Sequence, residues 1–132
     1  MKIRQGFVTN SSSSSFIIAV KGGLDNIEAF IDIDNKLWKR FIANSIRHAF
    51  EISDADDTQS AEKLFSDEKG LKVYMEDMYT PQTNEEASKY KKLVKDGYVF
   101  YRKDVSYHDS YLNRQINDMC DGKNIILIEN NS

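Results

Sequence analysis

The segment Phe16–Val20, FIIAV, sets the fold class of this chain. It lies between the serines Ser11 to Ser15 and the glycine pair at 22–23. The run is too short for a helix and is apolar on both faces of an extended chain, so it predicts a strand in the middle of a covered sheet. A second run, Ile125–Ile128, follows the turn pair Asp121-Gly122 and predicts another central strand beside the first.

Most of the chain between these runs has apolar residues at helical spacing. One apolar stripe predicts a long helix that begins at a cap on Asp34 or Asn35, with its polar residues, including Arg47, facing water. The stripe consists of Leu37, Trp38, Phe41, Ile42, Ile46, Ala49 and Phe50. Further helices are predicted over residues 24–31, over 58–69 with a stop at Gly70, over 83–94 after a capping box, and over 110–119 with a cap at Asp109 or Ser110.

The predicted class is α+β, or α/β, with three or four strands packed by four to five helices. The strands are expected near residues 16–20, 98–107 and 124–129. The pattern of residues 71–75 is compatible with a strand or with a helical turn. We favour a strand, which would be the fourth strand of the sheet. Residues 1–15 are predicted to be a polar, Ser-rich leader, and residues 16–132 a single globular domain.

The composition of the chain argues against several classes of protein. The chain has 132 residues and one cysteine, which argues against a disulfide framework and for the cytoplasm. Its 18 basic and 21 acidic residues give a net charge of -3, which argues against direct nucleic-acid binding. No apolar stretch approaches the roughly 18 residues of a transmembrane span, so no membrane partner is expected.

Residues 6–16, GFVTNSSSSSF, carry the most specific signal in the sequence. They resemble a start-of-protein motif of small and mostly uncharacterised proteins of bacteriophages and prophages of Gram-positive bacteria. That motif reads Gly-Phe-Val-(Ser/Thr)-Asn, followed by a run of five serines and a phenylalanine. The resemblance covers Met1 to Phe16, and Thr9 stands where serine is commoner. It implies a phage or mobile-element origin and carries over no catalytic residue.

The serine segment has two physical interpretations. Consecutive small residues could turn their backbone amides inward as an anion-binding nest, with Lys2 and Arg4 supplying positive charge. Alternatively, polyserine is a flexible polar leader or a recognition tag. The leader is favoured because the glycines and the following helix of known phosphate loops are missing.

Residues for catalysis or metal binding are few. His48 is expected to be a partly buried structural residue, and His108 has Asp109 beside it but no recognisable nucleophile. The acidic run 54–57 lacks the glycine and the bidentate glutamate of a calcium loop. Cys120 is expected to pack as a small core residue. The sequence therefore predicts no enzyme, no catalytic residue, no metal and no cofactor.

Charge is unevenly distributed along the chain, with an acidic stretch at 51–68 and a basic one at 89–103. Each could bind a partner, or each could be an ordinary solvated surface. The candidates for binding a protein partner are Glu51, Asp54, Asp56, Asp57, Glu62, Asp67 and Glu68. The candidates for binding an anion or a nucleotide are Ser11, Ser12, Ser13, Ser14, Ser15, Lys89, Lys92, Arg102 and Lys103.

These features favour a non-enzymatic phage or prophage accessory protein that binds a host protein or a defence-system protein, for example as an anti-defence inhibitor. The first alternative is a small-ligand binder that sequesters a nucleotide signal. The second is a structural protein associated with the virion. The oligomeric state stays open.

Overall fold

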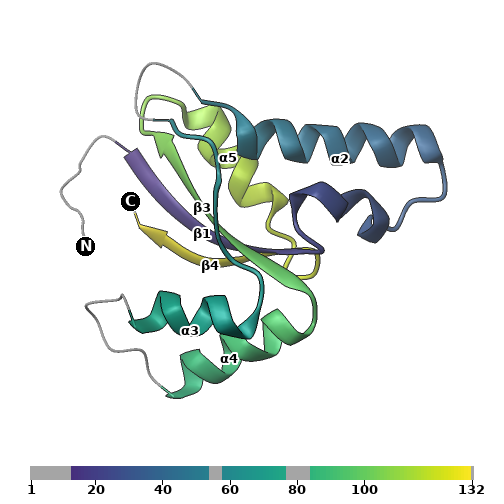
Figure 1. The fold of residues 1–132 in the computed structure, drawn as a ribbon. Helices are drawn as coiled ribbons and strands as arrows, with labels where there is room; N and C mark the ends of the chain where they lie inside the picture. Colours follow the sequence, from purple (N-terminus) through teal and green to yellow (C-terminus); the bar gives the residue numbers. More distant parts are fainter. Residues whose placement is uncertain (1–12, 54–57, 77–83, 132) are drawn as a thin grey trace.

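A four-stranded antiparallel sheet, in the order β2-β3-β1-β4, organises the computed structural model of this α+β protein (Figure 1). The structure describes residues 13–53, 58–76 and 84–131. In chain order the elements are β1 (Ser13–Lys21), η1 (Leu24–Phe30), α2 (Lys36–Glu51), β2 (Glu62–Phe65), α3 (Glu68–Glu76), α4 (Asn84–Lys95), β3 (Tyr98–Ser106), α5 (Ser110–Met119) and β4 (Ile125–Asn131).

Helices cover both faces of the sheet: α2 and α5 lie on one side, and α3 and α4 on the other (Figure 1). Alternate residues of β1 therefore enter different cores. Phe16, Ile18 and Val20 are fully buried in the α2/α5 core, whereas Ala19 is fully buried in the α3/α4 core. This arrangement confirms the prediction that FIIAV is a central strand.

Several predictions about the strands need correction. β1 begins at Ser13, and β4 pairs with β1 as predicted but lies at the edge of the sheet rather than in its middle. Residues 71–75, predicted as a strand, are helical within α3. Residues 62–65, predicted as part of a helix, form β2 and pair with β3.

The start of α3 explains why strand and helix were predicted the wrong way round in residues 62–75. The carboxylate of Asp67 accepts a hydrogen bond of 2.7 Å from the N–H of Gly70, which caps the first turn of the helix. Gly70 therefore lies at the start of α3 instead of ending a helix. The residues before Asp67 are left extended, and they pair with β3 at positions such as Glu62 opposite Arg102.

Other predicted helix ends are confirmed. The side chain of Asn35 accepts hydrogen bonds from the N–H groups of Leu37 and Trp38, and Asp109 accepts one from Leu112. Gly97 follows α4 with a φ of 93°, as a glycine stop requires. The predicted capping box begins at Thr83, which lies outside the described residues.

Arg47 differs from its predicted role, because it holds η1 against α2 instead of facing water. Its guanidinium donates hydrogen bonds of 2.9 and 3.2 Å to the carbonyl oxygens of Leu24 and Asp25. The hydroxyl of Tyr101 on β3 accepts the N–H of Leu24 at 3.0 Å. Side chains from α2 and β3 thus fix the start of η1.

A carboxylate forms the turn into β4. Asp121 Oδ1 accepts hydrogen bonds of 2.8, 2.8 and 3.0 Å from the N–H groups of Lys123, Asn124 and Ile125. Burial by itself would raise the pKa of Asp121, but these backbone hydrogen bonds outweigh it and lower the pKa from its ordinary value.

The substitution Asp121→Ala is expected to destabilise the protein by about 1 kcal/mol at neutral pH, the typical cost of losing a side-chain cap. Because the pKa is lowered in the folded state, this stabilisation is complete above the ordinary carboxyl pKa of about 3.9 and disappears as the pH falls through the lower folded value. Urea unfolding at a series of pH values from neutral to acid measures both the loss of stability and its dependence on pH. The exposed Asp118→Ala is the control, and an equal effect of the two substitutions would contradict the assignment.

Candidate functional site

The acidic and basic stretches do not form two separate charged surfaces. Residue Glu62 of β2 lies opposite Arg102 of β3 in the sheet. On the adjoining helices, the carboxylate of Glu68 lies 3.8 Å from the ammonium of Lys91 and 3.9 Å from that of Lys95. Folding therefore brings opposite charges together, and the polarity of the sequence is partly cancelled within the molecule.

The remaining acidic candidates lie at separate places. Glu51 is exposed at the end of α2, and Asp67 caps α3. Asp54, Asp56 and Asp57 lie outside the described residues. The carboxylate of Asp67 is thus used within the protein as a helix cap.

The serine candidates belong to a strand. Ser13–Ser15 pair with Asp104–Ser106 of β3, so their backbone is extended and does not curve into the concave nest considered above. The side chain of Ser14 is buried, and the hydroxyl of Ser15 donates a hydrogen bond of 2.7 Å to Asp104. Ser11 and Ser12 lie outside the described residues.

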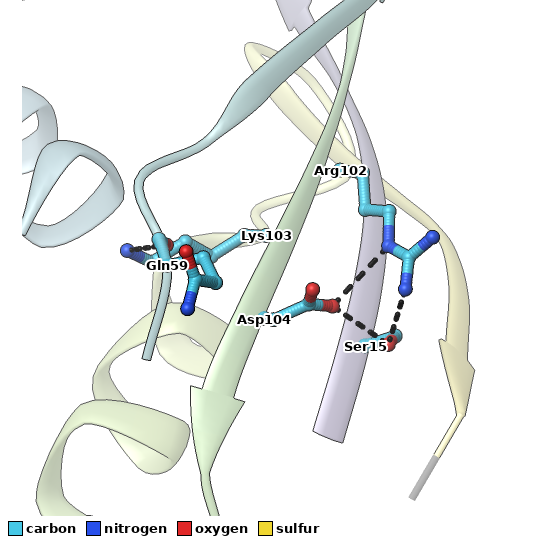
Figure 2. Close-up of polar contacts among 5 residues, drawn as sticks. All are labelled: Ser15, Gln59, Arg102, Lys103 and Asp104. Carbon is cyan, nitrogen blue, oxygen red and sulfur yellow. Dashed lines mark hydrogen bonds and ion pairs between the residues drawn. The ribbon is translucent and has the colours of Figure 1, made fainter. Parts of the chain in front are cut away.

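Arg102 is already engaged by neighbouring side chains (Figure 2). Its Nε atom donates to Asp104 Oδ1 at 3.2 Å, and one terminal nitrogen donates to the Ser15 hydroxyl at 3.5 Å. Burial raises the pKa of Tyr74, Glu129 raises it further, and Arg102 opposes the rise. One guanidinium thus lies among several carboxylates, which does not favour an anion site here.

The two basic residues next to each other on β3 have opposite environments. Figure 2 shows Arg102 and Lys103 on opposite sides of the strand. Lys103 is fully buried, and its ammonium donates hydrogen bonds of 2.5 Å to the carbonyl oxygens of Ile52 and Gln59. Its prediction as a ligand-binding surface cation is therefore wrong, because the ammonium joins the end of α2 to the segment that leads into β2. Lys89 and Lys92 are exposed on α4.

Replacing Lys103 with methionine keeps a long apolar side chain but removes the ammonium. We expect Lys103→Met to lower the free energy of unfolding by about 1–3 kcal/mol for each carbonyl that is left without a donor. Urea denaturation measures this loss. The exposed Lys92→Met is the matched control, for which a change within about 0.5 kcal/mol is expected; equal stability of the two variants would refute the structural role.

The histidines do not converge on a reactive centre. His48 is exposed on α2, contrary to the predicted partial burial, since it lies on the side of the helix away from Ala49 and Phe50. His108 is exposed in the β3–α5 turn, where its backbone N–H donates to the Ser106 hydroxyl. In the described ranges, no three His, Cys, Asp or Glu side chains are grouped so that they could hold a metal ion.

Cys120 packs at the end of α5, as predicted for a small core residue. Its thiol is half-buried and donates to the carbonyl oxygen of Ile116 at 3.2 Å. Burial raises the pKa of Cys120 to about 11, and Asp121 adds to the rise. The reactive thiolate is therefore scarce at neutral pH.

We expect iodoacetamide to alkylate folded Cys120 about 10- to 100-fold more slowly at pH 7.5 than it alkylates the urea-unfolded chain, because the thiolate fraction is smaller. The rate should rise with pH up to about 11. Intact-mass measurement over time gives both rates. Equal rates for folded and unfolded protein would be inconsistent with a buried thiol.

The largest departure from the predicted burial lies at the amino-terminal end of α2. Leu37, Trp38 and Phe41 are 78, 60 and 62% exposed, whereas Ala43, Ile46, Ala49 and Phe50 of the same helix are buried. Trp38 and Phe41 contact each other edge to face, with ring centroids 5.8 Å apart. We call Leu37, Trp38 and Phe41 the α2 patch.

Helix geometry explains why the single predicted stripe is wrong. Successive residues are rotated by about 100°, so Leu37 lies roughly 180° and Phe41 roughly 140° around the axis from Ile46. The spacings of three and four therefore mixed two faces of the helix. A helical-wheel projection of the sequence would have separated Leu37 and Phe41 from the core face. Trp38 lies only about 20° from Ala49 on such a wheel and is exposed in the first turn of the helix.

The charges around the α2 patch are also unusual for a helix start. The first turn of α2 contains no acidic residue, although carboxylates are favoured there by the helix dipole. Instead it begins with Lys36, and Lys39 and Arg40 follow one turn later. Positive charge thus accompanies the α2 patch along the helix, although Lys39 lies about 160° around the axis from Phe41.

A groove lies between α3 and α4. Its volume is about 480 Å³, and Leu71, Met75 and Ala87 contribute apolar lining. Charged residues, among them Lys72 and Glu76, border it. The segment that joins the two helices lies outside the described residues, so the groove is not assigned a ligand.

No protein-family model matches the chain, and no curated protein or solved structure is significantly similar to it. None of the helices in the described part of the chain has the length and apolar character that a membrane crossing requires. The α2 patch is the candidate functional site, because its large apolar side chains are exposed and lie together on one helix.

Proposed function

We propose that this protein is a non-enzymatic phage or prophage accessory protein that binds a host or defence-system protein in the bacterial cytoplasm, with the α2 patch as its contact surface. The observation that carries the binding function is the exposure of Leu37, Trp38 and Phe41 on one helix. The resemblance of residues 6–16 to phage and prophage proteins supports the origin.

The α2 patch has the composition of a protein-binding surface. Fully burying a large apolar side chain is worth about 1.5–3 kcal/mol, and that stabilisation is largely unused while these side chains face water. Tryptophan is also among the residues that most often dominate binding energy in protein interfaces. A cluster of such residues on a soluble domain is typical of a contact surface.

The flanking charges indicate the character of the partner. A cation near a helix amino terminus loses about 0.3–1 kcal/mol relative to an acidic residue, so Lys36, Lys39 and Arg40 do not serve helix stability. Residues that break a local stability rule are expected where function requires them. These cations favour a partner surface that has an apolar pocket with carboxylates at its rim.

The nucleotide-sequestering and virion-associated alternatives stay predictions. For the first, the described geometry offers little support, because Lys103 is buried and Arg102 is paired with Asp104. The candidates Lys89 and Lys92 are exposed and remain available for a test with nucleotides.

Photo-crosslinking tests the contact surface even while the partner is unidentified. A photoreactive phenylalanine derivative replaces Phe41 in one variant and Val73 in a second variant, and both variants are expressed in the bacterial host. Val73 is the matched control because it is also an exposed apolar residue but lies on α3, which covers the other face of the sheet. We expect one host protein to crosslink from position 41 and not from position 73; equal crosslinking from both positions would argue against the α2 patch.

With that partner purified, Trp38→Ala is expected to weaken binding by about 30-fold or more, corresponding to a hot spot of about 2 kcal/mol. The free energy of unfolding should change by about 0.5 kcal/mol or less, because the side chain is exposed. Trp38 is the single tryptophan, so a blue shift of its emission on binding reports its burial directly. Undiminished affinity of Trp38→Ala would overturn the assignment.

A further inference from the structure

Strand β4 lies at an edge of the sheet although its sequence is that of a central strand. Ile126 and Ile128 pack partly against the α3/α4 core, and Leu127 packs partly against the α2/α5 core. Each face of β4 therefore carries apolar side chains that the described residues cover incompletely. Strands that are apolar on both faces normally have a neighbour on each side.

The two edges of the sheet differ in how they are protected. At the opposite edge, β2 has only four residues and carries the charges of Glu62 and Lys63, which are features that discourage pairing with another chain. β4 has seven residues, IILIENN, with Glu129 as its charged residue. In the described residues, the features that protect the β4 side are the bulge at the Ile17–Ile18 register shift and the charge of Glu129.

The hydrogen-bond pattern shows which backbone groups of β4 face outward. Lys21 N–H donates to the carbonyl of Asn124 at 2.8 Å, and Ile126 lies opposite Ala19. Because antiparallel residues alternate, the backbone groups of Ile125 and Leu127 point away from β1. Those of Ile125 bond to Asp121 and Gly122 in the turn, so Leu127 is the first residue beyond the turn that presents its backbone to the open edge.

We propose that β4 pairs with β4 of a second copy of this chain, antiparallel and about a two-fold axis near Leu127. The two four-stranded sheets then continue into each other, and both cores extend across the axis. A two-fold contact uses the same surface on both subunits and closes on itself. Growth stops at the dimer because the other edge of each sheet is the short, charged β2.

Charge and shape both favour a second copy as the occupant of this edge. When the pairing is centred on Leu127, the two Leu127 residues exchange both hydrogen bonds. Glu129, which pairs with Ile17 beyond the bulge, lies two residues from the axis, so the two acidic side chains do not face each other. The occupant must also be apolar on both faces to cover Ile126 and Ile128 on one side and Leu127 on the other. β4 itself has this pattern, whereas a peptide with one polar face does not.

Analytical ultracentrifugation of the full chain over about 1 to 100 µM tests the proposal. The expected result is a shift from the monomer mass of 15.2 kDa to twice that mass as the concentration rises. Leu127→Pro should abolish the shift, since proline removes the outward N–H while the pairing of β4 with β1 does not use that group. Trp38→Ala, which alters the α2 patch, should dimerise like the unmodified protein.

Amide hydrogen exchange provides a measurement that needs no substitution. Exchange in the 125–131 segment should slow as the concentration rises, while exchange in β2 should not change. A protein that stays monomeric up to about 100 µM overturns the proposal. So does dimerisation that survives Leu127→Pro and is lost in Trp38→Ala, because that result places self-association on the α2 patch. The monomeric result leaves heterologous binding through the α2 patch as proposed, whereas self-association on the α2 patch would count against it. The crosslinking experiment tests that binding separately.

Discussion

The double burial of β1 is the constraint on which the rest of the structure depends. Its even-numbered apolar residues require one layer of helices and its odd-numbered residues require another, so the chain must place helices on both faces of one sheet. Hydrogen bonding requires a strand on each side as well, and β3 and β4 fill these positions. The helices α2 and α5 on one face, and α3 and α4 on the other, follow from this demand.

In strand β3, successive side chains point to opposite faces of the sheet, and this alone gives two similar residues different roles. Arg102 and Lys103 are adjacent cations, yet one is half exposed beside a carboxylate and the other is enclosed among backbone carbonyls. A buried ammonium is costly unless hydrogen bonds compensate for lost water, and the carbonyls of Ile52 and Gln59 provide such bonds. Lys103 thus joins Ile52 at the end of α2 to Gln59 through hydrogen bonds, in addition to the apolar packing of Ile52 against the core.

Local signals in the sequence predicted much of this fold. The apolar run 16–20 and the caps at Asn35 and Asp109 were predictable because their causes lie within a few residues. The strand at 62–65 and the helix at 71–75 were not predictable in this way. β2 becomes a strand only through pairing with β3, which is distant in sequence. The burial of Lys103 depends on the same long-range neighbours. The exposure of Leu37 and Phe41 could have been predicted from their angular position on the helix, but the exposure of Trp38 could not, because it lies at nearly the same angle as the buried Ala49.

The place of β1 in the sheet also determines when the fold can form. β1 comes first in the described chain, yet its neighbours β3 and β4 are separated from it by most of the remaining residues. During synthesis, which proceeds from the amino terminus, residues 16–20 have neither neighbouring strand until β3, which begins at Tyr98, has been made. Such distant pairings slow folding and leave an aggregation-prone segment exposed in the interval. Shielding of residues 16–20 during translation would therefore favour correct folding of this protein.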